Sequence, residues 1–144
     1  MSVLLTTTID IDATPEEVWA VLTDFPAYGQ WSNFSRIDGV AELGTTLAMR
    51  MPGFNFRSKV TVVTPNEQLQ WSAHLFSDRF FLGQHTFTLT VNPDGTTRVT
   101  NSEEFSGASV VPFQRLFSGN SEGGYAAFNR GLKSRVEQLA AVRA

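Results

Sequence analysis

Apolar and polar side chains alternate along most of the first two thirds of the chain. Residues 3–11 alternate first, and similar stretches follow between residues 37 and 105, separated by turn signals such as Pro52-Gly53 and Pro65-Asn66. A period of two is typical of strands that bury one face, and short strands joined by tight turns are typical of antiparallel meanders. The pattern therefore predicts a curved antiparallel sheet of about six to seven strands.

The parity of each stretch predicts which side chains face the core. In the first stretch the inward positions are Leu5, Thr7, Ile9 and Ile11. In the later stretches they are Leu47, Met49, Met51, Phe54, Phe56, Ser58, Val60, Val62, Leu69, Trp71, Ala73 and Leu75. Most of these side chains are aliphatic or aromatic, so the sheet is expected to have one strongly apolar face.

A helix-start signal follows the first stretch. Thr14 can cap the free backbone N–H groups, Pro15 suits the first helical position, and Glu17 completes a capping box. The helix is expected to stop at Pro26, because proline interrupts helical hydrogen bonding. Residues 28–34 (YGQWSNF) are expected to form an aromatic turn or a short second helix.

The end of the chain has the three- and four-residue spacing of an amphipathic helix. Its apolar stripe consists of Tyr125, Phe128, Leu132, Val136 and Leu139. Arg130, Lys133, Glu137 and Gln138 occupy the other side, and the charges of residues 129–137 are expected to form a solvated face. Before it, residues 110–117 predict a shorter apolar helix, and residues 118–124 predict a break. Two interpretations of residues 106–124 stay open: a mobile lid, or a helix kink that accommodates bulky neighbours.

These elements predict one α+β domain that spans residues 1–144. It consists of a strand, one or two short helices, the remaining strands and the long C-terminal helix. A single sheet with that helix laid across its concave face buries every apolar stripe.

Composition and charge narrow the function classes. The 14 acidic and 11 basic residues give a net charge of −3, without a run of lysines and arginines, so no nucleic-acid partner is expected. The chain has no cysteine, which excludes disulfides and thiolate metal sites. The apolar runs are short and the N-terminus lacks the basic region of a signal peptide. We therefore expect no stable membrane insertion and a cytoplasmic location.

One titratable residue interrupts the apolar face. In the stretch FLGQHTFTLTV, residues 81–91, the buried positions are Phe87, Leu89 and Val91, and counting back by two reaches His85. Because a buried polar ring is unfavourable without a hydrogen-bond partner, His85 is expected to have either a partner or a function.

The following hairpin supplies a candidate partner. Residues that face each other in an antiparallel pair share one side of the sheet. For a turn at residues 92–95, the register that opposes apolar side chains to apolar ones places Glu103 opposite His85 and Asn101 opposite Phe87. The sequence thus predicts a polar patch of His85, Asn101 and Glu103 on the concave face.

Three interpretations of this patch stay open. His85 and Glu103 can simply satisfy each other, they can hold the polar end of a ligand, or they can act as acid and base while Asn101 polarises a carbonyl. No metal site is expected, because the other histidine, His74, has the opposite parity and faces solvent.

Aromatic and small residues favour a ligand cavity between the sheet and the C-terminal helix. Gly83, Gly131 and Ala73 are small where bulky residues could stand, and ligand pockets combine apolar walls with a few polar groups. The residues expected to contact the ligand are Met49, Phe56, Trp71, His85, Phe87, Asn101, Glu103, Phe105, Phe128 and Leu132. Tyr28 and Trp31 either border its entrance or hold the first helix on the sheet.

Several segments together resemble the SRPBCC superfamily. They are IDATPEEVW (residues 11–19), LTDFP (22–26), Tyr28, Trp31, LQW (69–71), GQH (83–85), EEFSG (103–107) and NRGLKSRVE (129–137). The superfamily includes START lipid-transfer domains, birch-pollen-allergen relatives and the polyketide cyclase/dehydrase group. The resemblance covers nearly the whole chain and implies a helix-grip fold with a hydrophobic cavity between sheet and helix. The chain departs from its relatives at residues 31–33, often Trp-Asn-Pro elsewhere, and at Gly131, often a larger residue.

The leading functional hypothesis is binding or transport of a small hydrophobic molecule such as a lipid, an isoprenoid or an aromatic polyketide-like compound. No cofactor is expected, and the oligomeric state stays open. The alternative is a polyketide cyclase/dehydratase-like enzyme that uses His85 and Glu103 as acid and base. A protein-interaction module, the role of the co-chaperone relatives, ranks third, because the outer faces of the strands are rich in Thr and Ser.

Overall fold

The computed structural model describes residues 2–75, 77–108 and 121–143. Within these ranges, seven strands form one antiparallel sheet in the order β1-β7-β6-β5-β4-β3-β2. The strands are β1 (Ser2–Ile11), β2 (Arg36–Asp38), β3 (Thr46–Met51), β4 (Phe54–Thr64), β5 (Gln68–Leu75), β6 (Phe81–Val91) and β7 (Thr97–Ser106). The helices are α1 (Pro15–Leu22), the 3₁₀ helix η1 (Phe25–Gln30) and α3 (Ser121–Arg143). The predicted antiparallel sheet is confirmed.

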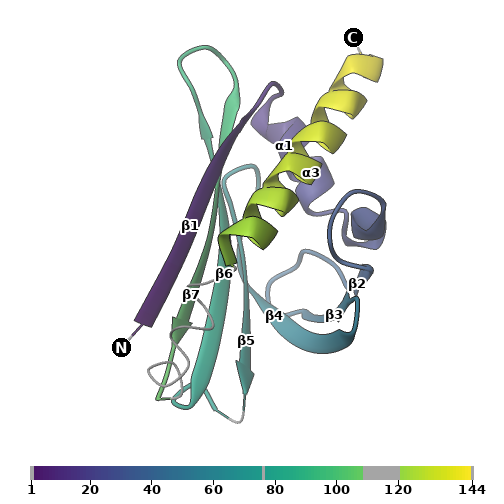
Figure 1. Cartoon of the computed structure of the whole chain (residues 1–144). Coiled ribbons are helices and arrows are strands. Elements are labelled where there is room, and N and C mark those ends of the chain that lie inside the picture. Colours follow the sequence, from purple (N-terminus) through teal and green to yellow (C-terminus); the bar gives the residue numbers. More distant parts are fainter. Residues whose placement is uncertain (1, 76, 109–120, 144) are drawn as a thin grey trace.

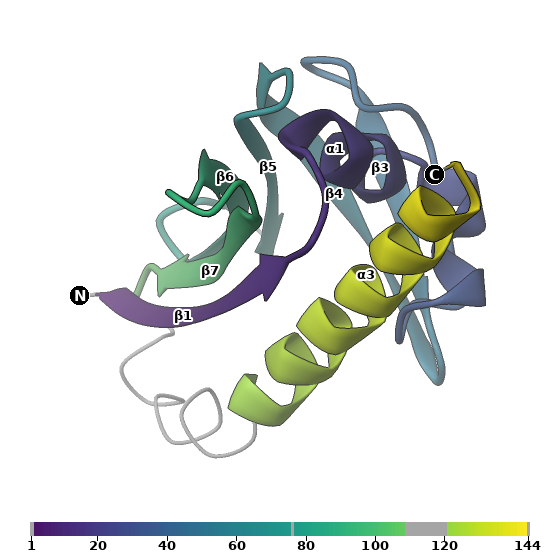
Figure 2. The same ribbon diagram turned by 90° about the horizontal axis from the view of Figure 1, so that it is seen from above.

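The sheet curves, and α3 runs across its concave side (Figures 1 and 2). The helix packs against β1 and α1. The largest fully buried side chains are Tyr28, Phe25, Phe87, Ile11, Leu22, Ile37, Leu47, Met49, Leu69, Leu132, Val18 and Val60. They come from strands and helices alike, so the core lies between the sheet and the helices. This arrangement confirms the α+β helix-grip fold.

Local signals start α1 as predicted. The hydroxyl of Thr14 accepts a hydrogen bond from the backbone N–H of Glu17 at 3.2 Å, and the Glu17 carboxylate accepts one from the backbone N–H of Thr14 at 3.0 Å. The end of this helix was predicted wrongly: α1 ends at Leu22, and Pro26 lies in the first turn of η1. Proline is accommodated there because the first N–H groups of a helix have no partner within it.

The C-terminal helix buries the predicted stripe. Phe128, Leu132 and Val136 are each at most 3% exposed. The helix begins at Ser121, so residues 121–124 are helical where a break was predicted. The short helix expected at residues 110–117 lies outside the described residues, as does most of the segment for which a lid or a kink was considered. No helix in the described ranges is long and apolar enough to cross a membrane.

Strand parity is confirmed inside the sheet and fails near its edges. A β-bulge between Val60 and Val62 shifts the register of β4 against β5, so Val63 packs against the core in place of Val62. Three predicted core positions at strand ends are exposed: Phe54, Leu75 and Val91. These predictions are wrong because each residue is the first or last of its strand, next to a turn or loop, where neighbouring elements do not cover the side chain.

Gly131 marks a close approach between α3 and the residues that follow η1. A Cβ atom on Gly131 would stand 2.3 Å from the backbone oxygen of Trp31. The expectation that Gly131 widens a cavity is therefore wrong, since the missing side chain lets two backbones touch. Tyr28 is fully buried and packs against Trp31 and Phe128. Of the two roles considered for Tyr28, it has the packing role.

We expect Gly131→Ala to lower the free energy of unfolding by about 1–3 kcal/mol, the usual cost of overpacking. The sign of this change is diagnostic. In a helix without such a contact, alanine in place of glycine raises the stability by about 1 kcal/mol. Gly124→Ala is the matched control: a Cβ there meets nothing within 4 Å, so it should stabilise the fold by about 0.5–1 kcal/mol. Urea unfolding measures both. Stabilisation by both substitutions would contradict the contact with Trp31.

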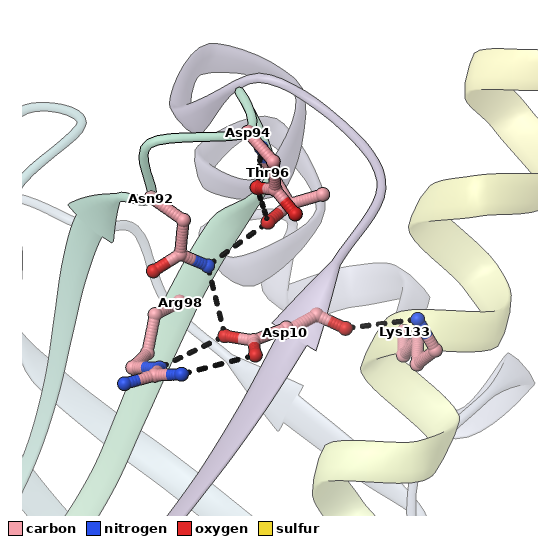
Figure 3. A network of polar contacts seen from close by, with 6 residues as sticks. All are labelled: Asp10, Asn92, Asp94, Thr96, Arg98 and Lys133. Atoms are coloured by element: carbon pink, nitrogen blue, oxygen red, sulfur yellow. Dashed lines mark hydrogen bonds and ion pairs between the residues drawn. The ribbon is translucent and has the colours of Figure 1, made fainter.

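A polar network joins β1, β7 and α3 near the β6–β7 turn (Figure 3). Arg98 holds the carboxylate of Asp10 with two bonds, from Nε to Oδ1 at 2.9 Å and from Nη2 to Oδ2 at 3.1 Å. Asn92 also donates to Asp10 Oδ1 at 3.0 Å, and Lys133 Nζ donates to the Asp10 backbone oxygen at 2.8 Å. The bonds from Arg98 and Asn92 lower the pKa of Asp10 from 3.8 to about 2.

The lowered pKa predicts a defined acid sensitivity. A carboxyl whose folded pKa lies below its unfolded value stabilises the fold above the unfolded pKa, and this contribution is lost as pH falls through the folded one. Asp10→Asn should therefore lower Tm most near neutral pH, and the difference from the parent should shrink between about pH 4 and pH 2. Thermal unfolding across this range measures it. Asp12→Asn, which removes a charge nearby without touching Arg98, is the control, and an equally pH-dependent effect there would contradict the assignment.

Candidate functional site

His85 lies on the concave face, in the position that strand alternation predicted. Across the β6–β7 ladder, Glu103 opposes His85 and Asn101 opposes Phe87. The predicted register is thus confirmed. His85 is 8% exposed and Asn101 is 1% exposed. The structure brings together the three polar residues that the sequence predicted as one patch.

A continuous chain of side chains holds one nitrogen of His85. Nε2 lies 2.6 Å from Oδ1 of Asn101. Nδ2 of Asn101 donates to Oδ1 of Asn129 at 2.9 Å, and Nδ2 of Asn129 donates to the hydroxyl of Thr7 at 2.8 Å. Because Asn101 presents its oxygen, Nε2 of His85 carries the hydrogen and donates it. The chain crosses from β6 through β7 and α3 to β1 and fixes the orientation of the imidazole.

The other nitrogen of His85 faces a carboxylate. Nδ1 lies 3.7 Å from Oε1 of Glu103, beyond hydrogen-bond distance. The same oxygen accepts a hydrogen bond from the hydroxyl of Tyr125 at 2.6 Å. Burial, with the neighbouring carboxylate, raises the pKa of Tyr125, so its hydroxyl stays protonated and donates.

Aromatic rings surround the imidazole. Phe87 stacks on His85 with ring centroids 4.6 Å apart and an interplanar angle of 20°. The ring centroid of Trp71 lies 5.3 Å from that of His85. The ring of Tyr125 approaches His85 edge-on, with a centroid distance of 5.6 Å. Phe87 continues the aromatic cluster to Phe128 on α3, at 5.4 Å. The polar patch therefore lies on an apolar wall, and the ring of His85 belongs to both.

The other predicted ligand residues fall into two groups. Met49 and Leu132 are fully buried in the packed core. Phe56 and Phe105 are half-buried, and Phe56 stacks on the exposed Phe54 with centroids 5.9 Å apart. In this structure Phe56 therefore belongs to the β3–β4 hairpin rather than to the ring cluster around His85.

Two hollows of about 280 Å³ each lie among the described residues, and neither is lined by His85. The first lies on the convex face, where it is lined by Leu4, Gln68, Gln70, Gln84, Thr86, Thr88, Ser102 and Glu104. The second is lined by Ala48, Met49, Arg50, Asn55, Phe56 and Arg57. Arg50, Asn55 and Arg57 make the walls of the second hollow more polar than the ring cluster around His85. A ligand-sized cavity between sheet and helix stays a prediction.

Three residues of the hydrogen-bond system were not predicted as site residues: Thr7, Tyr125 and Asn129. Thr7 is the β1 partner of Asn101, and its inward parity was visible in the sequence. Asn129 begins the segment whose charges were expected to form a solvated face, but its own side chain is buried, at 2% exposed. Its signal was its spacing, because it follows Tyr125 by four positions and precedes Leu132 by three, which places it on the apolar stripe.

Known structures with this fold include proteins of different activities. Protein MLL2253 from Mesorhizobium loti is 24% identical, with a TM-score of 0.75 over 94% of this chain and 98% of its own. Zhui aromatase/cyclase from Streptomyces sp. R1128 is 12% identical, with a TM-score of 0.75 over 96% of this chain and 95% of its own. Truncated norcoclaurine synthase from Thalictrum flavum is 15% identical, with a TM-score of 0.69 over 94% of each chain. At these identities the likeness shows a shared fold.

Sequence comparison is more specific than the structural likeness. No curated protein matches the chain. A family model described as "Polyketide cyclase / dehydrase and lipid transport" matches residues 2–142, nearly the full length. The chain therefore belongs to the polyketide cyclase/dehydrase and lipid transport family, within the SRPBCC superfamily that its sequence resembles.

Proposed function

We propose that the protein binds and carries a small hydrophobic molecule on the concave face of the sheet, next to α3, without transforming it. Lipids, isoprenoids and aromatic polyketide-like compounds are the candidate classes. His85, Asn101 and Glu103 hold the polar end, directly or through the bonds that orient them. The apolar body lies against aromatic side chains such as Phe105. The family description, which joins cyclases with lipid transport, supports a hydrophobic small-molecule partner.

One observation carries this proposal: the imidazole and the carboxylate on the apolar wall face each other without a hydrogen bond between them. Nε2 of His85 is bonded within a buried chain, whereas Nδ1 and Oε1 of Glu103 stay 3.7 Å apart. An imidazole and a carboxylate with a purely structural role would gain by closing to hydrogen-bond distance, since hydrogen bonds to charged groups are the stronger ones. A third polar group placed to one side of the pair can bond to both atoms.

Binding can be tested on the purified protein. Native mass spectrometry should detect a co-purifying apolar compound, and a panel of lipids, isoprenoids and aromatic polyketide-like compounds should contain at least one that raises Tm. A ligand at about 100 times its Kd stabilises the fold by about 2.7 kcal/mol. Absence of both a co-purifying compound and a Tm shift across the panel would overturn the proposal.

The same pair also supports a second candidate, a cyclase/dehydratase-like enzyme. An imidazole with one anchored nitrogen and a free nitrogen beside a carboxylate resembles an acid–base arrangement. The discriminating variant is Glu103→Gln, assayed with a polyketide-type substrate that the parent protein turns over. Loss of product formation with substrate affinity retained would establish proton transfer by Glu103. A parallel loss of affinity and turnover would leave the pair as a binding element.

A further inference from the structure

No arginine or lysine of the described residues pairs with the carboxylate of Glu103. Its side chain is 18% exposed, it accepts the bond from Tyr125, and its nearest basic nitrogen is Nδ1 of His85 at 3.7 Å. The arginine and lysine ion pairs of the described ranges all involve other carboxylates. A carboxylate beside apolar rings is unfavourable unless its charge is balanced.

The donors around Glu103 are already committed. The hydrogen on Nε2 of His85 goes to Asn101, and the hydroxyl hydrogen of Tyr125 goes to Glu103 itself. The groups left to face a ligand are acceptors. They are the lone pair on Nδ1 of His85 in the tautomer that bonds Asn101, and the two carboxylate oxygens of Glu103, of which Oε1 accepts only the bond from Tyr125. A ligand that bonds to this patch must therefore bring donors.

Space beside the carboxylate is preserved by Gly83. A Cβ atom on Gly83 would lie 3.7 Å from Oε2 of Glu103 and 3.6 Å from the ring of Phe105. Because glycine has no Cβ atom, residue 83 of β6 places no side chain against Oε2 of Glu103. No hydrogen bond within the described residues reaches Oε2.

We infer that the ligand presents a primary or secondary ammonium group to Glu103 and His85; this inference rests on the proposed function. One nitrogen placed about 2.9 Å from each can reach both Nδ1 and Oε1, which are 3.7 Å apart. The ammonium group supplies the donors and a positive charge that no described arginine or lysine brings to Glu103, and bonds between ions are the stronger ones. A ligand carboxylate would add a second negative charge and meet no free donor.

Three probes with one apolar body test the inference by calorimetry on the full chain: 2-(1-naphthyl)ethylamine, 2-(1-naphthyl)ethanol and 1-naphthylacetate. The amine is expected to bind most tightly. Glu103→Gln should weaken the amine by about 10-fold or more, because the bond loses its charge, and should change the alcohol little. The glutamine oxygen can still accept the bond from Tyr125, so the variant should fold, which its Tm verifies. Glu104→Gln removes the same charge one residue later, on the convex face, and should leave all three affinities unchanged.

A second variant separates binding from folding. Gly83→Ala places a methyl group beside Oε2 at ordinary contact distances. It should weaken the amine while leaving Tm equal or higher, because alanine loses less backbone entropy than glycine in a strand. If Glu103→Gln proves unstable, the amine affinity of Gly83→Ala still tests the inference.

The outcomes distinguish the two proposals. Tighter binding of the alcohol or the acetate than of the amine, or amine affinity unchanged in Glu103→Gln, overturns the ammonium inference and leaves hydrophobic ligand binding standing. If none of the three probes and no compound of the lipid and polyketide panel binds, both proposals are overturned.

Discussion

Asn101→Leu is expected to lower the free energy of unfolding by about 2–6 kcal/mol. The substitution leaves two buried groups without partners, the Nε2–H of His85 and Oδ1 of Asn129. Each unsatisfied buried polar group costs about 1–3 kcal/mol. A domain of this size has a total stability of about 5–15 kcal/mol, so the loss is a large fraction of it. Urea unfolding, followed by tryptophan fluorescence, measures the change.

The control and the partner variant make this prediction specific to the buried chain. Asn55→Leu changes an exposed position on β4 and should alter stability by less than about 0.5 kcal/mol. Asn101→Leu combined with Asn129→Leu should cost less than the sum of the two single changes, because the partners are removed together. Strict additivity would show that the two amides do not form one chain, and His85 would then lack its anchor.

The parts of the fold that the sequence predicted correctly rest on local rules. The capping box of α1 depends on Thr14 and Glu17, which are three residues apart, and the β6–β7 register depends on one tight turn. The bulge at Val60 and Val62 and the close approach at Gly131 depend on distant segments. Alternation along β4 alone does not reveal that β4 carries an extra residue against β5.

In the candidate site, too, the local arrangement was predictable and the contacts between distant segments were not. His85, Asn101 and Glu103 belong to one hairpin, so parity and register were sufficient to place them on one patch. Tyr125 and Asn129 reach that patch from α3. Helical periodicity indicates which stripe faces the sheet, but not how far along the sheet each residue of the stripe lies. The buried chain could therefore be described only from the structure, although each of its members had the correct facing or spacing.

The second large effect is expected at Phe128, where Phe128→Ala should lower the free energy of unfolding by about 3–5 kcal/mol. Phe128 is 3% exposed. Its ring lies against four aromatic side chains, with centroid distances of 5.1–6.3 Å: Tyr28, Trp31, Phe34 and Phe87. These partners come from η1, the following turn and β6, so the ring joins α3 to the rest of the core. Its removal leaves a cavity that residues on three separate segments cannot readily fill.

Phe54→Ala separates this effect from the general loss of aromatic surface. Phe54 is 59% exposed and stacks only on Phe56 among the described ring pairs, so its removal should cost less than about 1 kcal/mol. The two variants delete the same atoms, and their difference in urea unfolding reports the packing of α3 on the sheet. Equal costs would mean that α3 does not hold the sheet through Phe128. The site would then lose its support as well, because the helix that carries Phe128 also positions Tyr125 and Asn129.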